Sequence, residues 1–162
     1  MIRGYFLAAG TARRPYVNAL VEFDGDNTYR GHTEIGGIVV TSTLHPFGQS
    51  TTPTLVKNGT ELRLGGSLAN ALTPAGDLKL SLADGVSATM SGDVSTVPDS
   101  ALLVDAGLGA NLTITGKIGP ADQASITMTG HGTLVLSNPD RQNRFGIIRD
   151  SIGTVRDRKS VV

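Results

Sequence analysis

Three histidines and a few carboxylates are the side chains of this chain whose types and spacing could do chemistry. His32 and Glu34 are two residues apart, so a strand would place both on one face. Together with His45 or His131 they could form a metal site that has only nitrogen and oxygen ligands. The spacing matches no metal motif, and His131 stands between two glycines, as a turn residue does. Surface or turn histidines are the favoured interpretation, and no cofactor is predicted.

Asp105 is the carboxylate whose neighbours most suggest catalysis, since residues 103–107 have the sequence Leu-Val-Asp-Ala-Gly. This segment resembles the Asp-Thr/Ser-Gly loop of aspartic proteases, in which two facing carboxylates share a proton and activate water. Residues 1–6 and 13–23, MIRGYF and RRPYVNALVEF, also resemble the first two strands of bacterial retropepsin-like aspartyl proteases. This resemblance implies a hydrolase, and it covers residues 1–23 of 162.

The catalytic motif that this family requires is not found in the chain. The family places Leu-Val-Asp-Thr-Gly-Ala soon after the second strand, whereas residues 38–42 here are Ile-Val-Val-Thr-Ser. Asp105 comes much later, and Ala106 stands where the hydroxyl residue of the loop is expected. A retropepsin-like hydrolase, active or inactive, therefore stays an alternative function with Asp105 as its candidate residue.

The elements that would position these groups are strands. Apolar and polar residues alternate at 61–64, 77–82, 111–115 and 125–129, which is the period of a strand with one buried face. Glycine-containing turns such as Asn58-Gly59 and Asp84-Gly85 end these runs and are typical of two-residue hairpins. The pattern predicts an all-β fold of about ten strands, a meander of antiparallel hairpins closing into a β-barrel or stacking as a β-sandwich.

Charge divides the chain into two parts, although the formal net charge is zero. Residues 31–139 carry four basic and eight acidic side chains, whereas residues 140–162 carry six basic and three acidic ones. We therefore expect a β domain over 1–139 and a basic C-terminal extension over 140–162, which could bind an acidic surface. The candidate interaction residues are Arg141, Arg144, Arg149, Arg156, Arg158 and Lys159.

Composition excludes several functional classes. The chain has no cysteine, so neither disulfides nor thiolate metal sites can form. Aromatic residues make up 4% and do not alternate with the basic residues, so nucleic-acid binding is not expected. No run of apolar residues reaches the length of a membrane-spanning helix. A soluble protein is expected, in the cytoplasm or within an assembled particle.

The favoured function is that of a non-catalytic structural or binding module, because the chain has few titratable groups and no cluster of acid and base residues. We expect it to self-associate, or to join a larger assembly through an acidic partner surface. Two alternatives remain at this stage, the retropepsin-like hydrolase and a β-barrel that binds a small apolar ligand in a hollow interior.

Overall fold

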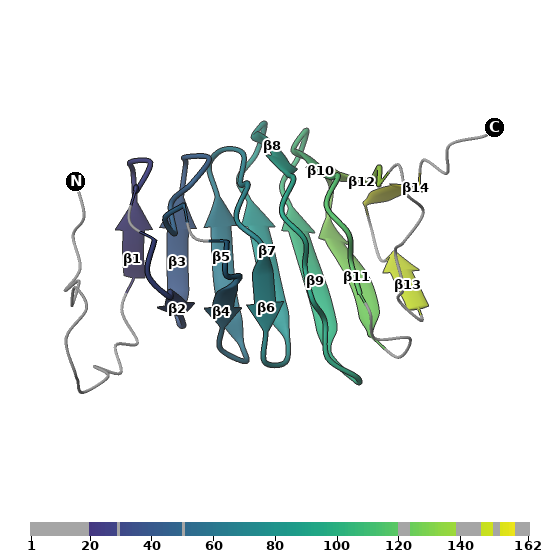
Figure 1. Ribbon diagram of the computed structural model, residues 1–162. Coiled ribbons are helices and arrows are strands. Elements are labelled where there is room, and N and C mark those ends of the chain that lie inside the picture. Colours follow the sequence, from purple (N-terminus) through teal and green to yellow (C-terminus); the bar gives the residue numbers. More distant parts are fainter. Residues whose placement is uncertain are drawn as a thin grey trace.

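The computed structural model describes residues 20–28, 30–49, 51–119, 124–138, 147–150 and 153–157, and these residues form a parallel β-solenoid (Figure 1). The chain winds around one axis, and each round, here called a coil, lays its strands on those of the round before. All strand pairs in these ranges are parallel. The all-β class is confirmed, but the antiparallel barrel or sandwich is wrong.

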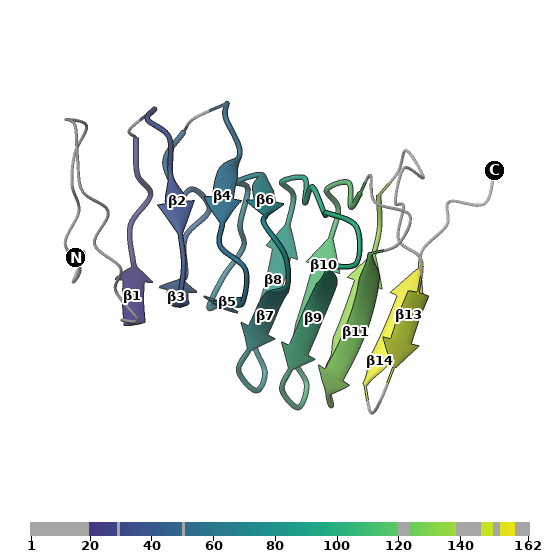
Figure 2. The same ribbon diagram turned by 90° about the horizontal axis from the view of Figure 1, so that it is seen from below.

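The strands form three sheets that extend along the stack of coils (Figure 2). The seven-stranded sheet contains β1 (Leu20–Phe23), β3 (Ile38–Thr41), β5 (Thr60–Leu64), β7 (Leu78–Leu82), β9 (Ala101–Ala106), β11 (Ser125–Gly130) and β13 (Ile147–Asp150). The four-stranded sheet contains β8 (Ser87–Met90), β10 (Asn111–Ile114), β12 (Thr133–Leu136) and β14 (Thr154–Asp157). The three-stranded sheet contains β2 (Glu34–Ile35), β4 (Thr54–Val56) and β6 (Leu72–Pro74).

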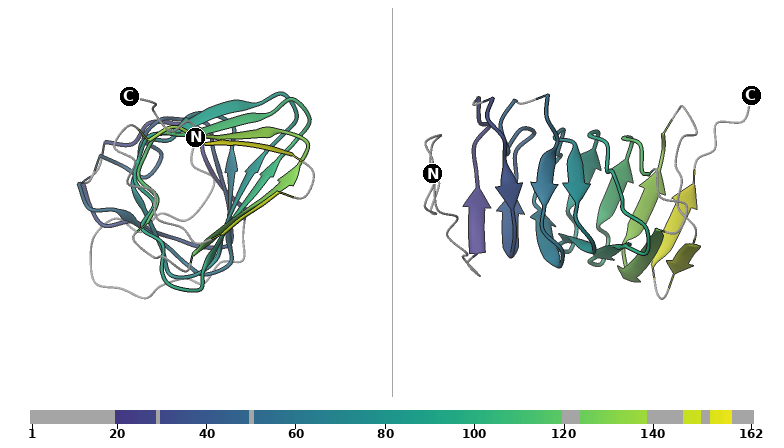
Figure 3. Two further views of the ribbon diagram at one scale, coloured as in Figure 1. Left: turned by 90° about the vertical axis from the view of Figure 1, so that its right-hand side faces the viewer. Right: turned by 60° about the horizontal axis from the view of Figure 1, so that its bottom comes forward.

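Successive coils overlie one another when the molecule is viewed along the stack (Figure 3). Their lengths differ, however, because 18 residues separate Leu20 from its strand partner Ile38, whereas 24 separate Leu78 from Leu102. Single bridges from Leu72 to Val94 and from Val94 to Ile118 continue the line of the three-stranded sheet into later coils. The variable coil length explains why the sequence has no fixed repeat period.

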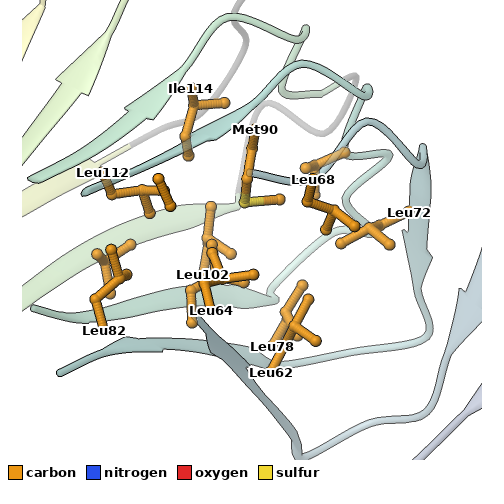
Figure 4. Packing of buried hydrophobic residues seen from close by; sticks show 14 of the residues in the cluster. Leu62, Leu64, Leu68, Leu72, Leu78, Leu82, Met90, Leu102, Leu112 and Ile114 are labelled. Carbon is orange, nitrogen blue, oxygen red and sulfur yellow. The ribbon is translucent and has the colours of Figure 1, made fainter. Parts of the chain in front are cut away.

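The core consists of rows of apolar side chains stacked from coil to coil. Val39, Leu62, Leu80, Val104 and Met128 form one such row along the seven-stranded sheet, and none of them is more than 2% exposed. Leucines and isoleucines of the four-stranded sheet point into the same interior (Figure 4). Each fully buried side chain of this kind contributes roughly 1.5–3 kcal/mol relative to an exposed one. The interior is thus filled with side chains, where a ligand-binding barrel would be hollow.

The predicted hairpins are wrong, because the two strands that each turn joins do not pair with each other. Asn58-Gly59 joins β4 to β5 and Asp84-Gly85 joins β7 to β8, but in each case the two strands belong to different sheets. Both glycines have positive φ angles, of 74° and 72°, but Asn58 and Asp84 do not, so neither corner is the type I′ turn of a two-residue hairpin, which needs positive φ at both residues. Period-two alternation does not distinguish the two folds, because an outer solenoid face meets solvent just as one face of an antiparallel sheet does.

Side chains of Asn and Asp at several corners tie one coil to the next. Asn58 Oδ1 accepts a hydrogen bond from the backbone N–H of Asp77 at 2.8 Å, and Asp84 Oδ1 accepts one from Leu108 at 2.9 Å. A glycine precedes each donor, and a Cβ atom on Gly76 or Gly107 would lie 2.4 or 2.3 Å from the accepting oxygen. The corners therefore require both the acceptor in one coil and the glycine in the following one.

The segment predicted as a basic extension contributes the last described coil. β13 pairs with β11 over four residues, and β14 pairs with β12 over four. These two strands lie at the end of the stack opposite β1 (Figure 1).

Candidate functional surface on the seven-stranded sheet

The outer face of the seven-stranded sheet brings charged residues from separate coils together. Alternation directs every second residue outward, and the parallel register aligns these residues in two rows along the stack. One row consists of Leu20, Ile38, Glu61, Lys79, Leu103 and Thr127 by register position. The other consists of Glu22, Val40, Arg63, Ser81, Asp105 and Thr129.

Glu61 is the centre of a charge network on this face. Its Oε1 atom accepts hydrogen bonds from Arg63 Nε and from Ser81 Oγ, both at 3.0 Å. Lys79 Nζ lies 3.8 Å from the same oxygen and 3.1 Å from Asp105 Oδ2. The network therefore joins β5, β7 and β9, which are three neighbouring strands from three coils.

The network keeps the Glu61 carboxylate ionised. The hydrogen bond from Arg63 is the largest influence and lowers the pKa of Glu61 below its ordinary value, and the Ser81 hydroxyl and the Lys79 charge act in the same direction. Partial burial opposes this shift by disfavouring the charge, but it is outweighed. Glu61 therefore acts as a fixed anion that orients two cations, and it is poorly suited to carry a proton in general acid catalysis.

A shallow groove runs beside the network, where the strands of the long sheet turn toward the next sheet. Its lining includes Val40, Arg63, Ser81 and Asp105 from the outer row and Gly65 and Gly107 from the corners. Glu61 lines it as well, so the groove combines a short apolar stretch with one cation, one hydroxyl and two anions. Such a lining suits contact with a mixed polar and apolar surface of another macromolecule.

Asp105 lies on the exposed outer row, with its side chain 44% accessible and paired with Lys79. An aspartic protease needs a second carboxylate facing the first so that the pair can share a proton. The carboxylate nearest to Asp105 in the network is that of Glu61, and the ammonium group of Lys79 contacts both. Of residues 1–23, which carry the resemblance, only 20–23 belong to the described ranges, where they form β1.

The candidate metal ligands are not brought together. Glu34 begins β2 and forms an ion pair with Lys57 at 3.5 Å, and His32 is exposed in the turn before it. His45 lies in the loop after β3, and His131 lies at the corner between β11 and β12. Within the residues that the structure describes, no group of three His, Cys, Asp or Glu side chains could hold a metal ion.

Two of the six predicted interaction residues lie in described strands. Arg149 is in β13 and Arg156 is in β14, where its side chain is exposed. Arg141, Arg144, Arg158 and Lys159 lie outside the described residues.

Sequence reasoning missed the network around Glu61, Arg63, Lys79 and Ser81. Each of these residues occupies a polar position in an alternating run, so the alternation correctly indicates that they face outward. Their proximity depends on a register of 18 residues between Glu61 and Lys79, and no local pattern reveals that register.

Comparisons with known proteins add no assignment to this geometry. The described residues contain no helix of the length and apolar character needed to cross a membrane. The chain matches no protein-family model, no curated protein and no solved structure.

Proposed function

We propose that this chain is a non-catalytic structural module that self-associates end to end, acting in the cytoplasm or within a larger particle. The observation that carries this proposal is the separation of charge along the stack. In the first described coil, residues 20–28 and 30–35 include Glu22, Asp24, Asp26 and Glu34 against the cation Arg30, whereas Arg3, Arg13 and Arg14 lie outside the described residues. The segment 140–162, which contains the last coil, carries six basic and three acidic residues.

The shape of the molecule supports a head-to-tail arrangement. The acidic coil containing β1 and β2 lies at the opposite end of the solenoid from β13 and β14, the two described strands of the basic segment 140–162 (Figure 1). Opposite charges at the two ends attract unlike ends of two copies, which is a heterologous contact, and such a contact closes into a ring or continues as a filament.

The outer face supports the non-catalytic part of the proposal. Glu61, Arg63, Lys79 and Asp105 pair with one another, so the anions and cations of this cluster offset each other's charge. A general acid or base needs a group whose pKa lies near the working pH, whereas the pKa of Glu61 is lowered away from that range.

Charge exchange at the two ends tests the proposal. Arg156→Glu should reduce the average mass measured by light scattering at low salt, because it reverses an exposed charge in the last coil. Glu22→Arg should do the same from the other end. The double variant should restore association, since the attraction is then reversed rather than removed. High salt should weaken association of the original chain, because charges are screened beyond about 8 Å at physiological ionic strength.

Lys117→Glu is the matched control, since it makes the same change of charge between the two ends of the stack, after β10. It should leave the mass close to that of the original chain. A monomer under all salt conditions would contradict the proposal, as would equal effects of Lys117→Glu and Arg156→Glu. Charge exchange is preferable to truncation, because removal of residues 139–162 would also delete β13 and β14.

A further inference from the structure

Asn58 and Gly59 form the dipeptide in which the side-chain amide nitrogen of asparagine is most easily lost as ammonia, since glycine offers no steric hindrance to attack by its backbone nitrogen. Both residues are exposed at the corner between β4 and β5. Water and hydroxide therefore have access to them. What restrains the reaction in this molecule is how the next coil holds both reacting groups.

The same residue of the following coil binds both groups. Asn58 Oδ1 accepts a hydrogen bond from the backbone N–H of Asp77 at 2.8 Å. The backbone N–H of Gly59 donates to the carbonyl oxygen of Asp77 at 2.9 Å. The carboxamide cannot turn toward the Gly59 nitrogen without losing the first bond. The nitrogen cannot lose its proton without placing a negative charge against the Asp77 carbonyl oxygen.

We propose that Asn58 is a latent deamidation site that reacts only when the corner between its coil and the coil of Asp77 opens. In the open state the Gly59 nitrogen attacks Asn58 Cγ, a C–N bond forms, and the carboxamide nitrogen leaves as ammonia with the proton from Gly59. Water then opens the resulting five-membered imide at one of its two carbonyl carbons. The net reaction consumes one water and releases one ammonia, with no change of oxidation state.

The two products have different consequences for the solenoid. Opening at the side-chain carbonyl gives aspartate at position 58, and aspartate is the acceptor at the equivalent corners formed by Asp84 and Asp93. Opening at the backbone carbonyl gives isoaspartate, which inserts one extra methylene into the main chain. The turn has no room for this extension, because Thr60 N and Thr60 Oγ1 both donate to the carbonyl oxygen of Lys57 across it. In the isoaspartyl product, β4 or β5 should therefore lose its register with the neighbouring strands of its own sheet.

The rate of deamidation in the folded and in the denatured chain tests this inference independently of self-association. The protein is incubated at mildly alkaline pH, with and without denaturant, and the peptide containing residue 58 is quantified by mass spectrometry. We expect the folded chain to react about ten- to a hundredfold more slowly, because two hydrogen bonds must break before attack. Equal rates in the two conditions would overturn the inference.

Variants at the corner identify the cause of the protection. Gly76→Ala should raise the rate in the folded chain toward the denatured value, because its Cβ would lie 2.4 Å from Asn58 Oδ1. Gly31→Ala is the control, since nothing lies within 4 Å of a Cβ there. Asn58→Asp should melt with the original protein, whereas chromatographically isolated isoaspartyl protein should melt earlier. Unchanged protection of Asn58 in folded Gly76→Ala would contradict the inference, as would equal melting temperatures of the aspartyl and isoaspartyl products. If Gly76→Ala does not fold, the comparison of deamidation rates of the original chain with and without denaturant decides the question.

Discussion

Lys79 Nζ lies 3.1 Å from Asp105 Oδ2, although 26 positions separate the two residues in the chain. Their strands, β7 and β9, are neighbours in the seven-stranded sheet, and the two side chains meet diagonally between the outer rows. The contact exists only because the coils stack in parallel with this register. Both side chains are partly exposed to solvent, which limits the energy of the ion pair.

A double-mutant cycle of Lys79→Met and Asp105→Asn should therefore give a small coupling energy. We expect less than about 1 kcal/mol, because solvent screens an ion pair whose side chains are 39% and 44% exposed. The coupling should fall further at high salt. Urea denaturation of the four proteins measures it, and a coupling of several kcal/mol would mean that this face is covered in solution.

Glu61 should make the stability of the protein depend on pH in the acid range. Its pKa is lowered in the folded state, so its contribution is fully present above the pKa of the unfolded chain and is lost as pH falls through the folded value. Unfolding of the original chain and of Glu61→Gln should be compared from about pH 6 to pH 3. The difference in stability between them should shrink as the pH falls. A difference that is constant or grows with acidity would contradict the assigned direction.

Ile114→Ala and Thr113→Ala should differ strongly in cost, although the residues are adjacent in β10. Ile114 is fully buried, whereas Thr113 faces outward and is half-buried. We expect a loss of roughly 2–5 kcal/mol for Ile114→Ala and less than about 1 kcal/mol for Thr113→Ala. Denaturant unfolding measures both. Equal losses would mean that the outer face of the four-stranded sheet is also packed.

Thr41→Val should leave the stability unchanged or raise it. Thr41 lies in an inward row, 1% exposed, between Phe23 and Leu64, and its hydroxyl oxygen has no hydrogen-bond partner in the described part of the chain. Valine has nearly the same shape and removes a buried polar group whose burial costs about 1–3 kcal/mol. A thermal melt compares the two proteins, and a marked drop in melting temperature would reveal a partner for the hydroxyl.

Gly107→Ala should cost much more than Gly31→Ala. A Cβ at Gly107 would lie 2.3 Å from Asp84 Oδ1 and 2.7 Å from the backbone nitrogen of Asp84, so the corner must shift. We expect a loss of at least about 1 kcal/mol, through the hydrogen bond from Leu108 to Asp84 and the displaced backbone. Similar free energies of unfolding of the two alanine variants, measured in urea, would show that the corner accommodates the added Cβ atom without loss of stability.

The alternation of apolar and polar residues predicted the strands and which side of each strand is buried. The alternation around Ile114 and around Met128 correctly gave strands and their buried side, because that choice depends only on the period of the strand. The direction of pairing could not be obtained in this way. Asn58-Gly59 and Asp84-Gly85 are the preferred residues of a hairpin, but a solenoid corner uses the same positive φ angle at glycine.

The candidate surface was not predictable for a related reason. Glu61 and Lys79 are 18 residues apart, but Lys79 and its row neighbour Leu103 are 24 apart, so no single period aligns the outer rows. The sequence does contain one signal of the stacked coils. An Asn or Asp at a turn is followed, one coil later, by a glycine that leaves room for its side chain, as Asn58 is by Gly76 and Asp84 is by Gly107.

The most direct test of the parallel solenoid is a disulfide between coils, for which the absence of cysteine makes the chain well suited. Thr89 and Thr113 are register partners on the outward side of β8 and β10. Neighbouring strands lie about 4.8 Å apart, within the Cα separation that a disulfide spans. The control pair is Thr89 with Thr133, since β12 lies one strand further from β8.

Mild oxidation of each double-cysteine variant, followed by mass spectrometry, gives the answer. The solenoid predicts an intramolecular disulfide for Thr89→Cys with Thr113→Cys and none for Thr89→Cys with Thr133→Cys. An antiparallel hairpin about Asp84-Gly85 would instead place Leu80 opposite Thr89. Failure of the first pair to form the bond, or equal bond formation in both pairs, would contradict the parallel stack of coils.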